Sequence, residues 1–229
     1  MPSQRPRVAV LYGGRSSEHA ISCVSAGGVL RALYPQRYEA IAIGIAPDGS
    51  WYRQSGDPDQ LRIVQGVLPQ VQPTDQALDL SAQPARAEVF AGGVDVVFPV
   101  LHGPWGEDGT VQGLLEMAGI PYVGSGVLAS ALAMDKGPMK QVLRSAGLVV
   151  SPFTVIADRV WHLERDLALD RVRSLGLPCF VKPARAGSSL GIPKVKQEQD
   201  LVAAIATARA HDPCVVVEAA VPGAREIEC

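Results

Sequence analysis

The chain has 229 residues, of which 47% are hydrophobic and 19% are charged, and its formal net charge is -2. This composition supports a globular core, and it gives no reason to expect nucleic acid or an anionic membrane as a partner. No apolar run nears the roughly 18 residues of a membrane span, and the run at 8–12 is too short for the core of a signal peptide. We therefore expect a cytoplasmic protein.

The cysteines and histidines are widely spaced along the chain. They form no CxxC pair and no spacing typical of zinc ligands, so a zinc site is not expected. In a cytoplasmic chain we expect the four cysteines to be reduced, buried and hydrophobic in behaviour: Cys23, Cys179, Cys214 and Cys229.

The first elements alternate between strand and helix. The β-branched run at 7–12 predicts a strand that stops at Gly13, and apolar residues at positions 26, 29, 30 and 33 predict a helical face after it. Alternating isoleucines predict a second strand at 39–45, and Trp51 begins a return strand after a turn.

Regular structure is interrupted at 53–87, where no steady period occurs and a surface excursion with a short strand or two is expected. A buried strand follows at 94–101, then a helix that ends at Gly119 and a short strand at 120–124. This strand–helix–strand order predicts an α/β fold with a doubly wound parallel sheet. Such sheets bind ligands beyond the carboxyl ends of their strands.

A second unit is predicted from about residue 134. Its expected elements are a helix from Pro138 to Gly147, a strand at 151–156, a charged surface helix at 160–175, a strand–loop–strand at 178–195, a helix at 198–210 and a strand at 214–218. A hairpin accompanied by helices indicates a small α+β domain.

The stretch FVKPARAGSSLG has the residue types of a phosphate-binding loop. Gly187 allows backbone N–H groups to approach an anion, Ser188 and Ser189 add hydroxyl donors, and Lys182 adds a positive charge. The GxxxxGK[ST] order of a P-loop is absent, so a hairpin turn with a solvated lysine is the alternative.

Lys136 stands at the front of a predicted helix, in MDKGPMK. A cation is disfavoured beside the positive end of a helix, and a bound anion would explain it there. A solvated lysine in the first turn is the simpler interpretation.

Two further stretches combine glycines with charged residues. LHGPWGEDGTVQG places His102, Glu107 and Asp108 in one turn, and Asp108 or Thr110 would cap the helix that follows. GGRSSEH lacks the GxGxxG spacing of a dinucleotide site. Glu18 there fits a capping box, or a carboxylate that is directed at an amino group.

In this order, these stretches resemble the D-alanine–D-alanine ligases of the ATP-grasp superfamily. The resemblance rests on residues 8–27, 97–136, 177–192 and 215–229, and the HGPWGEDGTVQG stretch is highly specific to these ligases. It implies that ATP phosphorylates the carboxylate of one D-alanine, and that the amine of a second D-alanine attacks the acyl phosphate, for peptidoglycan precursor synthesis. In phosphoryl transfer, positioning and charge neutralisation supply most of the catalysis.

The resemblance implies roles for single residues in the amino-acid site. Glu18 would hold the ammonium group of the first D-alanine and would be hydrogen-bonded to Ser188 in the phosphate loop. His102 would face the carboxylate of that substrate, and Glu107 would support the turn.

The resemblance likewise implies a nucleotide site, in which the cations neutralise phosphates, the loop clamps them, and the end of the chain holds adenine and ribose. The residues concerned are Lys136 and Lys182 for charge, Gly187, Ser188 and Ser189 in the loop, Glu218 for the adenine amino group, the backbone from Ala219 to Val221 for the adenine slot, and Glu226 for the ribose hydroxyls. The adenine segment, from Glu218 to Glu226, is slightly longer than is usual in the family.

The implied domain plan is an N-terminal substrate-binding domain at 1–134, a central ATP-binding domain at 135–226 and the start of a C-terminal domain at 227–229. The family holds Mg²⁺ or Mn²⁺ through residues of that third domain, and no stretch here resembles them. We therefore expect the C-terminal ATP-grasp domain and its metal ligands to be missing, and the chain alone not to complete the reaction.

Two alternatives stay open from the sequence. One is a short nucleotide-binding protein without catalysis, and the other is a D-alanine–D-lactate ligase. The resemblance also implies a homodimer built through the N-terminal domain.

Overall fold

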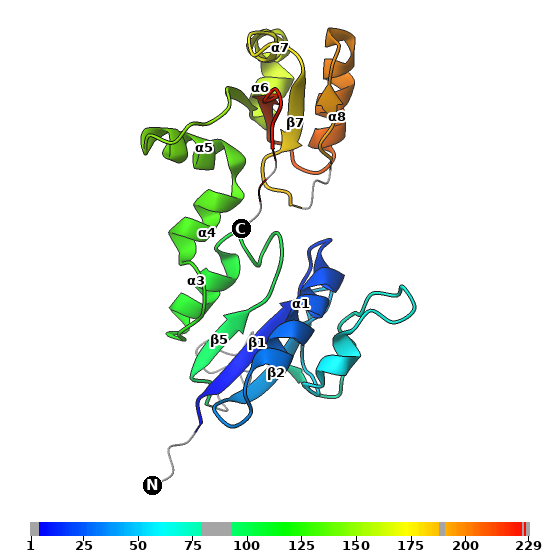
Figure 1. Ribbon diagram of the computed structural model, residues 1–229, viewed down its shortest axis with the longest axis vertical. Helices are drawn as coiled ribbons and strands as arrows, with labels where there is room; N and C mark the ends of the chain where they lie inside the picture. The colour runs from blue at the N-terminus through cyan, green and yellow to red at the C-terminus, as the bar shows by residue number, and fades with distance from the viewer. Residues whose placement is uncertain (1–4, 79–92, 188–190, 226, 228–229) are drawn as a thin grey trace. The chain divides into compact units, whose positions relative to one another are not determined.

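The computed structural model describes residues 5–78, 93–187, 191–225 and 227 (Figure 1). The chain divides into two compact units, Met1–Ala131 and Leu132–Cys229, each with a sheet of its own. No helix within the described residues is long and apolar enough to cross a membrane. The fold is a mixed α/β fold.

Three parallel strands form the middle of the first sheet. β1 (Arg7–Gly13) is central, with β2 (Glu39–Ile45) on one side and β5 (Val96–Pro99) on the other. β3 (Trp51–Arg53) runs antiparallel to β2, and β4 (Ala77–Leu78) runs antiparallel to β3 at the edge. The predicted parallel sheet is thus confirmed for the inner strands. The return strand predicted to begin at Trp51 is confirmed as β3, because a tight turn after β2 reverses the chain.

Helices cover both faces of this sheet. Because neighbouring residues of a strand point to opposite faces, β1 contributes to two cores. On one face α1 (His19–Ala32) packs Cys23, Ala26 and Leu30 against Val8 and Val10, and η1 (Pro58–Leu61) adds Leu61. On the other face α3 (Thr110–Met117) packs Val111 and Leu115 against Leu11 and Ile43. This two-sided cover is the doubly wound arrangement.

The segment after α3 differs from its prediction. The strand expected at 120–124 is reduced to one parallel bridge between Tyr122 and Val97. The helix α4 (Val127–Met134) was not expected. Its sequence VLASALAM is apolar almost all round and has no polar face that would reveal a helical period.

The second unit is built on an antiparallel sheet in the order β6-β9-β7-β8. The strands are β6 (Phe153–Ile156), β9 (Val215–Ala219), β7 (Cys179–Pro183) and β8 (Lys194–Val195). β9 lies in the interior of the sheet, paired with β6 on one side and β7 on the other. The last strand in the chain order therefore contacts two partners that are distant in sequence.

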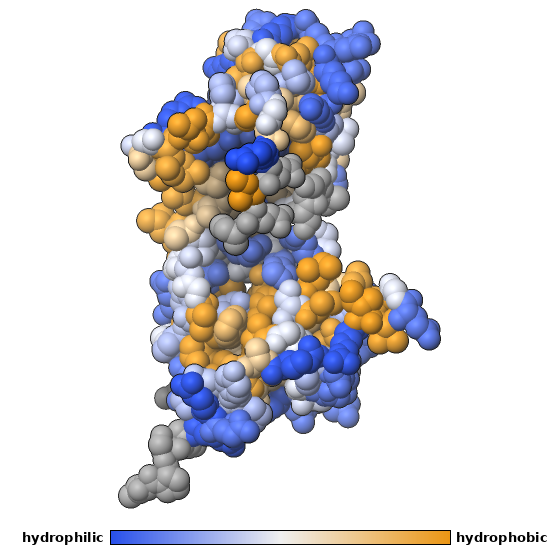
Figure 2. Space-filling view, in the orientation of Figure 1, coloured by the Kyte–Doolittle hydropathy of each residue, from blue (hydrophilic) through white to orange (hydrophobic). Residues whose placement is uncertain are grey.

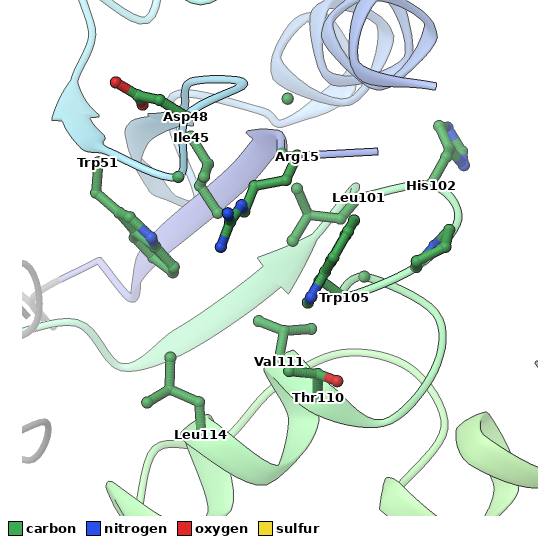
Figure 3. A pocket seen from close by; sticks show the side chains of 15 residues that line it. Arg15, Ile45, Asp48, Trp51, Leu101, His102, Trp105, Thr110, Val111 and Leu114 are labelled. Atoms are coloured by element: carbon green, nitrogen blue, oxygen red, sulfur yellow. The ribbon is translucent and has the colours of Figure 1, made fainter. Parts of the chain in front are cut away.

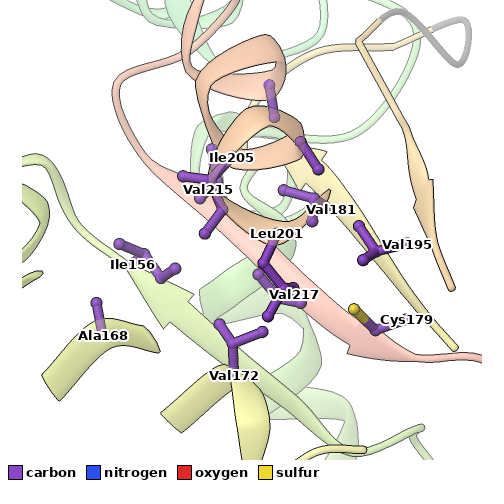
Figure 4. Close-up of a cluster of buried hydrophobic side chains, with 12 residues drawn as sticks. Ile156, Ala168, Val172, Cys179, Val181, Val195, Leu201, Ile205, Val215 and Val217 are labelled. Carbon is purple, nitrogen blue, oxygen red and sulfur yellow. The ribbon is translucent and has the colours of Figure 1, made fainter. Parts of the chain in front are cut away.

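One face of this sheet is covered by α7 (Arg165–Arg173) and α8 (Leu201–Arg209), which bury the core drawn in Figure 4. α5 (Lys136–Ser145) packs on the opposite face, where Gly137 meets Val155 and Arg144 stacks on the Phe153 ring. The surface helix predicted at 160–175 is confirmed as helical, but it is not one continuous helix. The chain forms α6 (Asp158–Leu163) and α7, separated at Glu164 by non-helical backbone angles.

The helix predicted at 198–210 is confirmed from Leu201 onward, where α8 begins after the 3-10 turn η3 (Glu198–Asp200). Cys23, Cys179 and Cys214 are free thiols, the first two buried as predicted and the third half-buried. Burial raises the pKa of Cys23 to about 11. Cys229 lies outside the described residues.

Candidate functional site

The turn after β1 is tied to the turn after β5 by two serine hydroxyls. Ser16 donates to the carbonyl oxygen of His102 at 2.7 Å and accepts from the backbone N–H of Glu18 at 3.1 Å. Ser22 donates to the carbonyl oxygen of Val100 at 2.6 Å and accepts from the N–H of Gly13. The carboxyl ends of β1 and β5 are therefore joined at the edge where ligand binding was predicted.

His19, to which the sequence analysis gave no role, stabilises the turn after β1. Its ring is buried, Nδ1 lies 2.7 Å from the carbonyl oxygen of Gly14, and Nε2 accepts from the N–H of Val71 at 3.1 Å. These partners assign a neutral ring with the proton on Nδ1. Both ring nitrogens of His19 thus contact backbone groups, which indicates a structural role for this residue.

The turn after β5 is stabilised by its own two carboxylates. Glu107 Oε2 accepts from the N–H of Gly103 at 2.6 Å. Asp108 accepts from the N–H of Trp105 at 2.8 Å and from that of Thr110 at 3.0 Å. The residue that caps α3 is Gly109, so the predicted side-chain cap at Asp108 or Thr110 is wrong, although Asp108 does organise the turn.

Glu18 and this turn are in direct contact. Gly103 has a φ of +74°, and a Cβ built on it would lie 2.4 Å from Glu18 Oε2. The Glu18 carboxylate therefore rests against a backbone position that has no room for a side chain. Glu18 is the cap residue of α1 without a side-chain cap bond, so a capping box does not explain it.

His102 is held by α1. Its Nε2 lies 2.9 Å from Ser25 Oγ, and His102 is one of the residues that line the neighbouring cavity (Figure 3). That cavity, of about 380 Å³, lies at the carboxyl edge of the sheet. Arg15 stacks over the half-exposed Trp105 ring in its wall, 5.6 Å from the ring centre. Glu18 does not line it, so the cavity and the carboxylate are adjacent but separate features.

In the second unit, Glu218 forms ion pairs with two lysines. The register of β9 with β7 places Glu218 opposite Phe180, so Lys182 is its diagonal neighbour on the same face. Lys182 Nζ lies 3.2 Å from Glu218 Oε1, and Lys140 Nζ lies 3.1 Å from Oε2. Ser151 donates to Oε2 at 3.3 Å.

Lys136 closes the same cluster from the first turn of α5. Its Nζ donates to the carbonyl oxygen of Ala186 at 2.6 Å and to that of Ala184 at 3.4 Å. Burial, and then the positive charge of Lys182, lower the pKa of Lys136. Two ammonium groups that repel one another in a partly buried site are a place where an anion is stabilising.

The loop that follows β7 is anchored at both of its described ends. Asp212 accepts from Arg185 Nε at 2.9 Å, from Arg185 Nη2 at 2.8 Å and from the backbone N–H of Arg185 at 2.9 Å. At the other end, a Cβ on Gly191 would meet His211 Cδ2 at 2.3 Å. The turn between α8 and β9, which contains His211 and Asp212, therefore anchors the loop after β7.

The remaining predicted residues fall in two groups. Gly187 is exposed in the loop, Ala219 ends β9 with its N–H bonded to the carbonyl oxygen of Pro152, and Val221 is exposed beyond it. Ser188, Ser189 and Glu226 lie outside the described residues.

Sequence reasoning missed Lys140 and Ser151. A signal for Lys140 was present, since it follows Lys136 by four residues and therefore lies one helical turn further along the same side. Nothing local marked Ser151, because its partner Glu218 is 67 residues away in the sequence.

Two protein families of known ligases match this chain over most of its length. The D-ala D-ala ligase N-terminus family matches residues 7–125, and the D-ala D-ala ligase C-terminus family matches residues 142–229. The D-alanine–D-alanine ligase of Mycolicibacterium gilvum (strain PYR-GCK) is 56% identical, over 98% of this chain and 63% of its own length. That of Paenarthrobacter aurescens (strain TC1) is 52% identical, over 98% and 62% respectively.

Solved ligases share the fold. The VanG D-Ala:D-Ser ligase from Enterococcus faecalis superposes with a TM-score of 0.82 at 35% identity, covering 96% of this chain and 64% of that one. The D-alanine-D-alanine ligase from Coxiella burnetii gives 0.75 at 31% identity, covering 96% and 65%. The two units thus have the architecture of ATP-grasp ligases.

The chain belongs to the D-alanine–D-alanine ligase family. It spans about 63% of the length of the curated relatives that it matches.

Proposed function

We propose that the protein is an ATP-dependent ligase that joins two D-alanines into D-alanyl-D-alanine for peptidoglycan precursor synthesis. The observation that carries the proposal is the partly buried cation pair of Lys136 and Lys182 beside Glu218. Relatives at 52–56% identity that bear the name D-alanine–D-alanine ligase support it.

The nucleotide would lie on the second unit. Lys136 and Lys182 fit a polyphosphate, because an anion relieves their mutual repulsion. Glu218 fits the adenine amino group, since an ionised carboxylate accepts and does not donate. We assign Gly187, Ser188 and Ser189 to the phosphates, Ala219 and Val221 to the adenine slot and Glu226 to the ribose hydroxyls.

The first D-alanine would lie at the turns of the first unit. Glu18 would hold its ammonium group, with Ser188 as the hydrogen-bonding partner of Glu18. His102 would face its carboxylate, and Glu107 would keep the turn in shape through the N–H of Gly103.

ATP supplies the phosphoryl group that activates the carboxylate of the first D-alanine. The residues of this chain orient the two reactants and offset negative charge, which is the main protein contribution in phosphoryl transfer. Lys136 and Lys182 neutralise the phosphates, and Glu18 fixes the amino acid through its charge. None of these side chains needs to transfer a proton.

A divalent ion, Mg²⁺ or Mn²⁺, belongs to the same proposal. Within the part of the chain that the structure describes, no three His, Cys, Asp or Glu side chains gather to bind a metal. That the C-terminal ATP-grasp domain and its metal ligands are missing from this chain stays a prediction.

The direct test is release of ADP by the full-length protein with ATP and Mg²⁺, since the 229-residue chain alone is not expected to complete the reaction. We expect release that depends on D-alanine, and a dipeptide product seen by mass spectrometry. ATP binding without D-alanine-dependent release would favour the short nucleotide-binding alternative. Absence of both would reject the proposal.

The second amino acid needs an assay of its own. The first structural neighbour is named a D-Ala:D-Ser ligase, whereas the curated relatives are named D-alanine–D-alanine ligases at higher identity. We therefore propose D-alanine as the second substrate. Competition among D-alanine, D-serine and D-lactate decides, and a preference for D-lactate would establish the other alternative.

We also propose a homodimer through the N-terminal unit. A hairpin bridged between Val64 and Val67 exposes four apolar side chains, those of Ile63, Val64, Val67 and Leu68 (Figure 2). Apolar groups that gather on a surface are typical of an interface. Val64→Glu with Val67→Glu should convert the dimer to monomer in light scattering, while Val202→Glu, at an exposed site on α8, should not.

A further inference from the structure

Lys140 is a buried lysine with a defined set of partners. Its side chain and that of Glu218 are each 11% exposed, and the two ions are 3.1 Å apart. Lys140 Nζ also donates to Ser151 Oγ at 3.3 Å and lies 5.5 Å from the centre of the Phe153 ring. An ammonium group removed from water needs such compensation.

The two oxygens of Glu218 are held by different elements. Oε1 faces Lys182 on β7, and Oε2 faces Lys140 on α5 and Ser151 before β6. Lys136 also acts on Glu218 through its charge. Lys182 is more exposed, at 26%, and lies at the base of the phosphate loop, where a polyphosphate would compete for it.

Lys140 is more buried than Lys182 and is not expected to contact the phosphates. Its ion pair with Glu218 and its hydrogen bond to Ser151 should therefore persist when a nucleotide binds at the loop. Cations beside a buried carboxylate stabilise its ionised form, which only accepts hydrogen bonds. The hydrogen-bond direction at Glu218 thus depends on Lys140 once Lys182 serves the phosphates.

We propose that Lys140 is a positioning residue that keeps Glu218 ionised and directed, so that the site selects a 6-amino purine over a 6-oxo purine. This inference rests on the proposed nucleotide site. A 6-amino group donates to the Glu218 carboxylate, whereas a 6-oxo group presents a second acceptor to it. Two acceptors that face one another repel, and the difference between the purines measures the charge on Glu218.

The test compares binding of ATP and of inosine triphosphate by titration calorimetry. Hydrogen bonds to charged groups are among the stronger ones, and we expect the wild type to bind ATP at least about tenfold more tightly than inosine triphosphate. In Lys140→Met this ratio should fall to within about twofold of one. Lys140→Arg, which keeps the charge, should restore most of it.

Arg144→Met is the matched control. Arg144 is one turn further along α5 and stacks on the same Phe153 ring, at 4.8 Å from the ring centre. Its substitution should change the melting temperature without changing the purine ratio. Should Lys140→Met fail to fold, Lys140→Gln removes the charge and keeps a polar group at the site.

The outcomes separate the two proposals. A purine ratio in Lys140→Met or Lys140→Gln equal to that of the wild type overturns the role of Lys140 and leaves the nucleotide site intact. A wild-type protein that binds neither nucleotide rejects the nucleotide site itself, and the role of Lys140 with it.

Discussion

A missing side chain at Gly103 decides where the Glu18 carboxylate can lie. Gly103→Ala places a methyl group against Glu18 Oε2 and imposes a positive φ on a residue with a Cβ. In the full-length protein we expect D-alanine-dependent ADP release to fall by at least about tenfold, and the free energy of unfolding to fall by about 1–2 kcal/mol. Steady-state kinetics at varied D-alanine and urea unfolding measure the two effects.

Gly119→Ala separates the two causes. Gly119 has a φ of +67° with nothing within 4 Å of the built Cβ, so its variant has the backbone cost without the collision. It should lose stability and keep its kinetics. Equal kinetics in the two variants would show that the Gly103 contact with Glu18 is unimportant.

At the same scale, the site could be predicted only in part. The roles proposed for Glu18, His102, Lys136, Lys182 and Glu218 come from the family resemblance of the stretches that contain them, and they stay predictions. The spacing of four residues from Lys136 was a signal for Lys140, but no local motif shows its partner, because the carboxylate of Glu218 lies on β9. A sequence motif identifies residue types, whereas the pairing of strands and the packing of helices on the sheet decide which charged side chains form ion pairs.

At the scale of elements, the strands were easier to predict than the helices. β2 occupies the predicted residues 39–45, and β9 lies within one residue of the predicted 214–218. α4 was missed because it is apolar almost all round, and the break at Glu164 was missed because no glycine or proline marks it. The antiparallel β4 strand is two residues long, and it depends on β3 for its pairing.

The turn between α8 and β9 supports the phosphate loop, and its stability should depend on pH. Burial would raise the pKa of Asp212, but the hydrogen bonds from Arg185 and from the backbone N–H of Cys214 outweigh it, so the pKa is lowered. A carboxyl group whose folded pKa lies below its unfolded value of about 3.9 stabilises the fold above that pH. The contribution is lost as pH falls through the folded value.

Asp212→Asn should therefore cost about 1–3 kcal/mol of unfolding free energy at pH 7. The difference from the wild type should shrink below about pH 4, where the wild-type carboxyl group also takes up its proton. Urea unfolding at pH 7 and pH 3 makes the comparison. Asp170→Asn, at an exposed ion pair with Arg173, should change little at either pH. A pH-independent deficit at Asp212 would contradict the electrostatic explanation.

For the whole molecule, the two units should respond to different ligands. All of the residues proposed to bind the nucleotide lie in Leu132–Cys229. The residues Glu18, His102 and Glu107, proposed to bind D-alanine, lie in Met1–Ala131. A ligand at 100 times its dissociation constant stabilises the state that binds it by about 2.7 kcal/mol. Hydrogen exchange should therefore slow in β7, β9 and α5 with ATP, and in the turns after β1 and β5 with D-alanine.

Protection of the same segments by both ligands would show that the assignments are wrong. Inosine triphosphate and L-alanine are the controls, since each keeps the charge of its counterpart and changes the group that is recognised.

The antiparallel sheet of the second unit places Phe153, Glu218 and Phe180 in one row across three strands. Five cations surround this row through ring contacts, ion pairs and charge: Lys136, Lys140, Arg144, Lys182 and Lys194. A chain with a net charge of -2 thus concentrates positive potential on one face, around a single acid of the row. Such local potential steers polyanions by diffusion, so the association rate of a nucleotide should fall steeply as salt is added, even where its dissociation rate does not change.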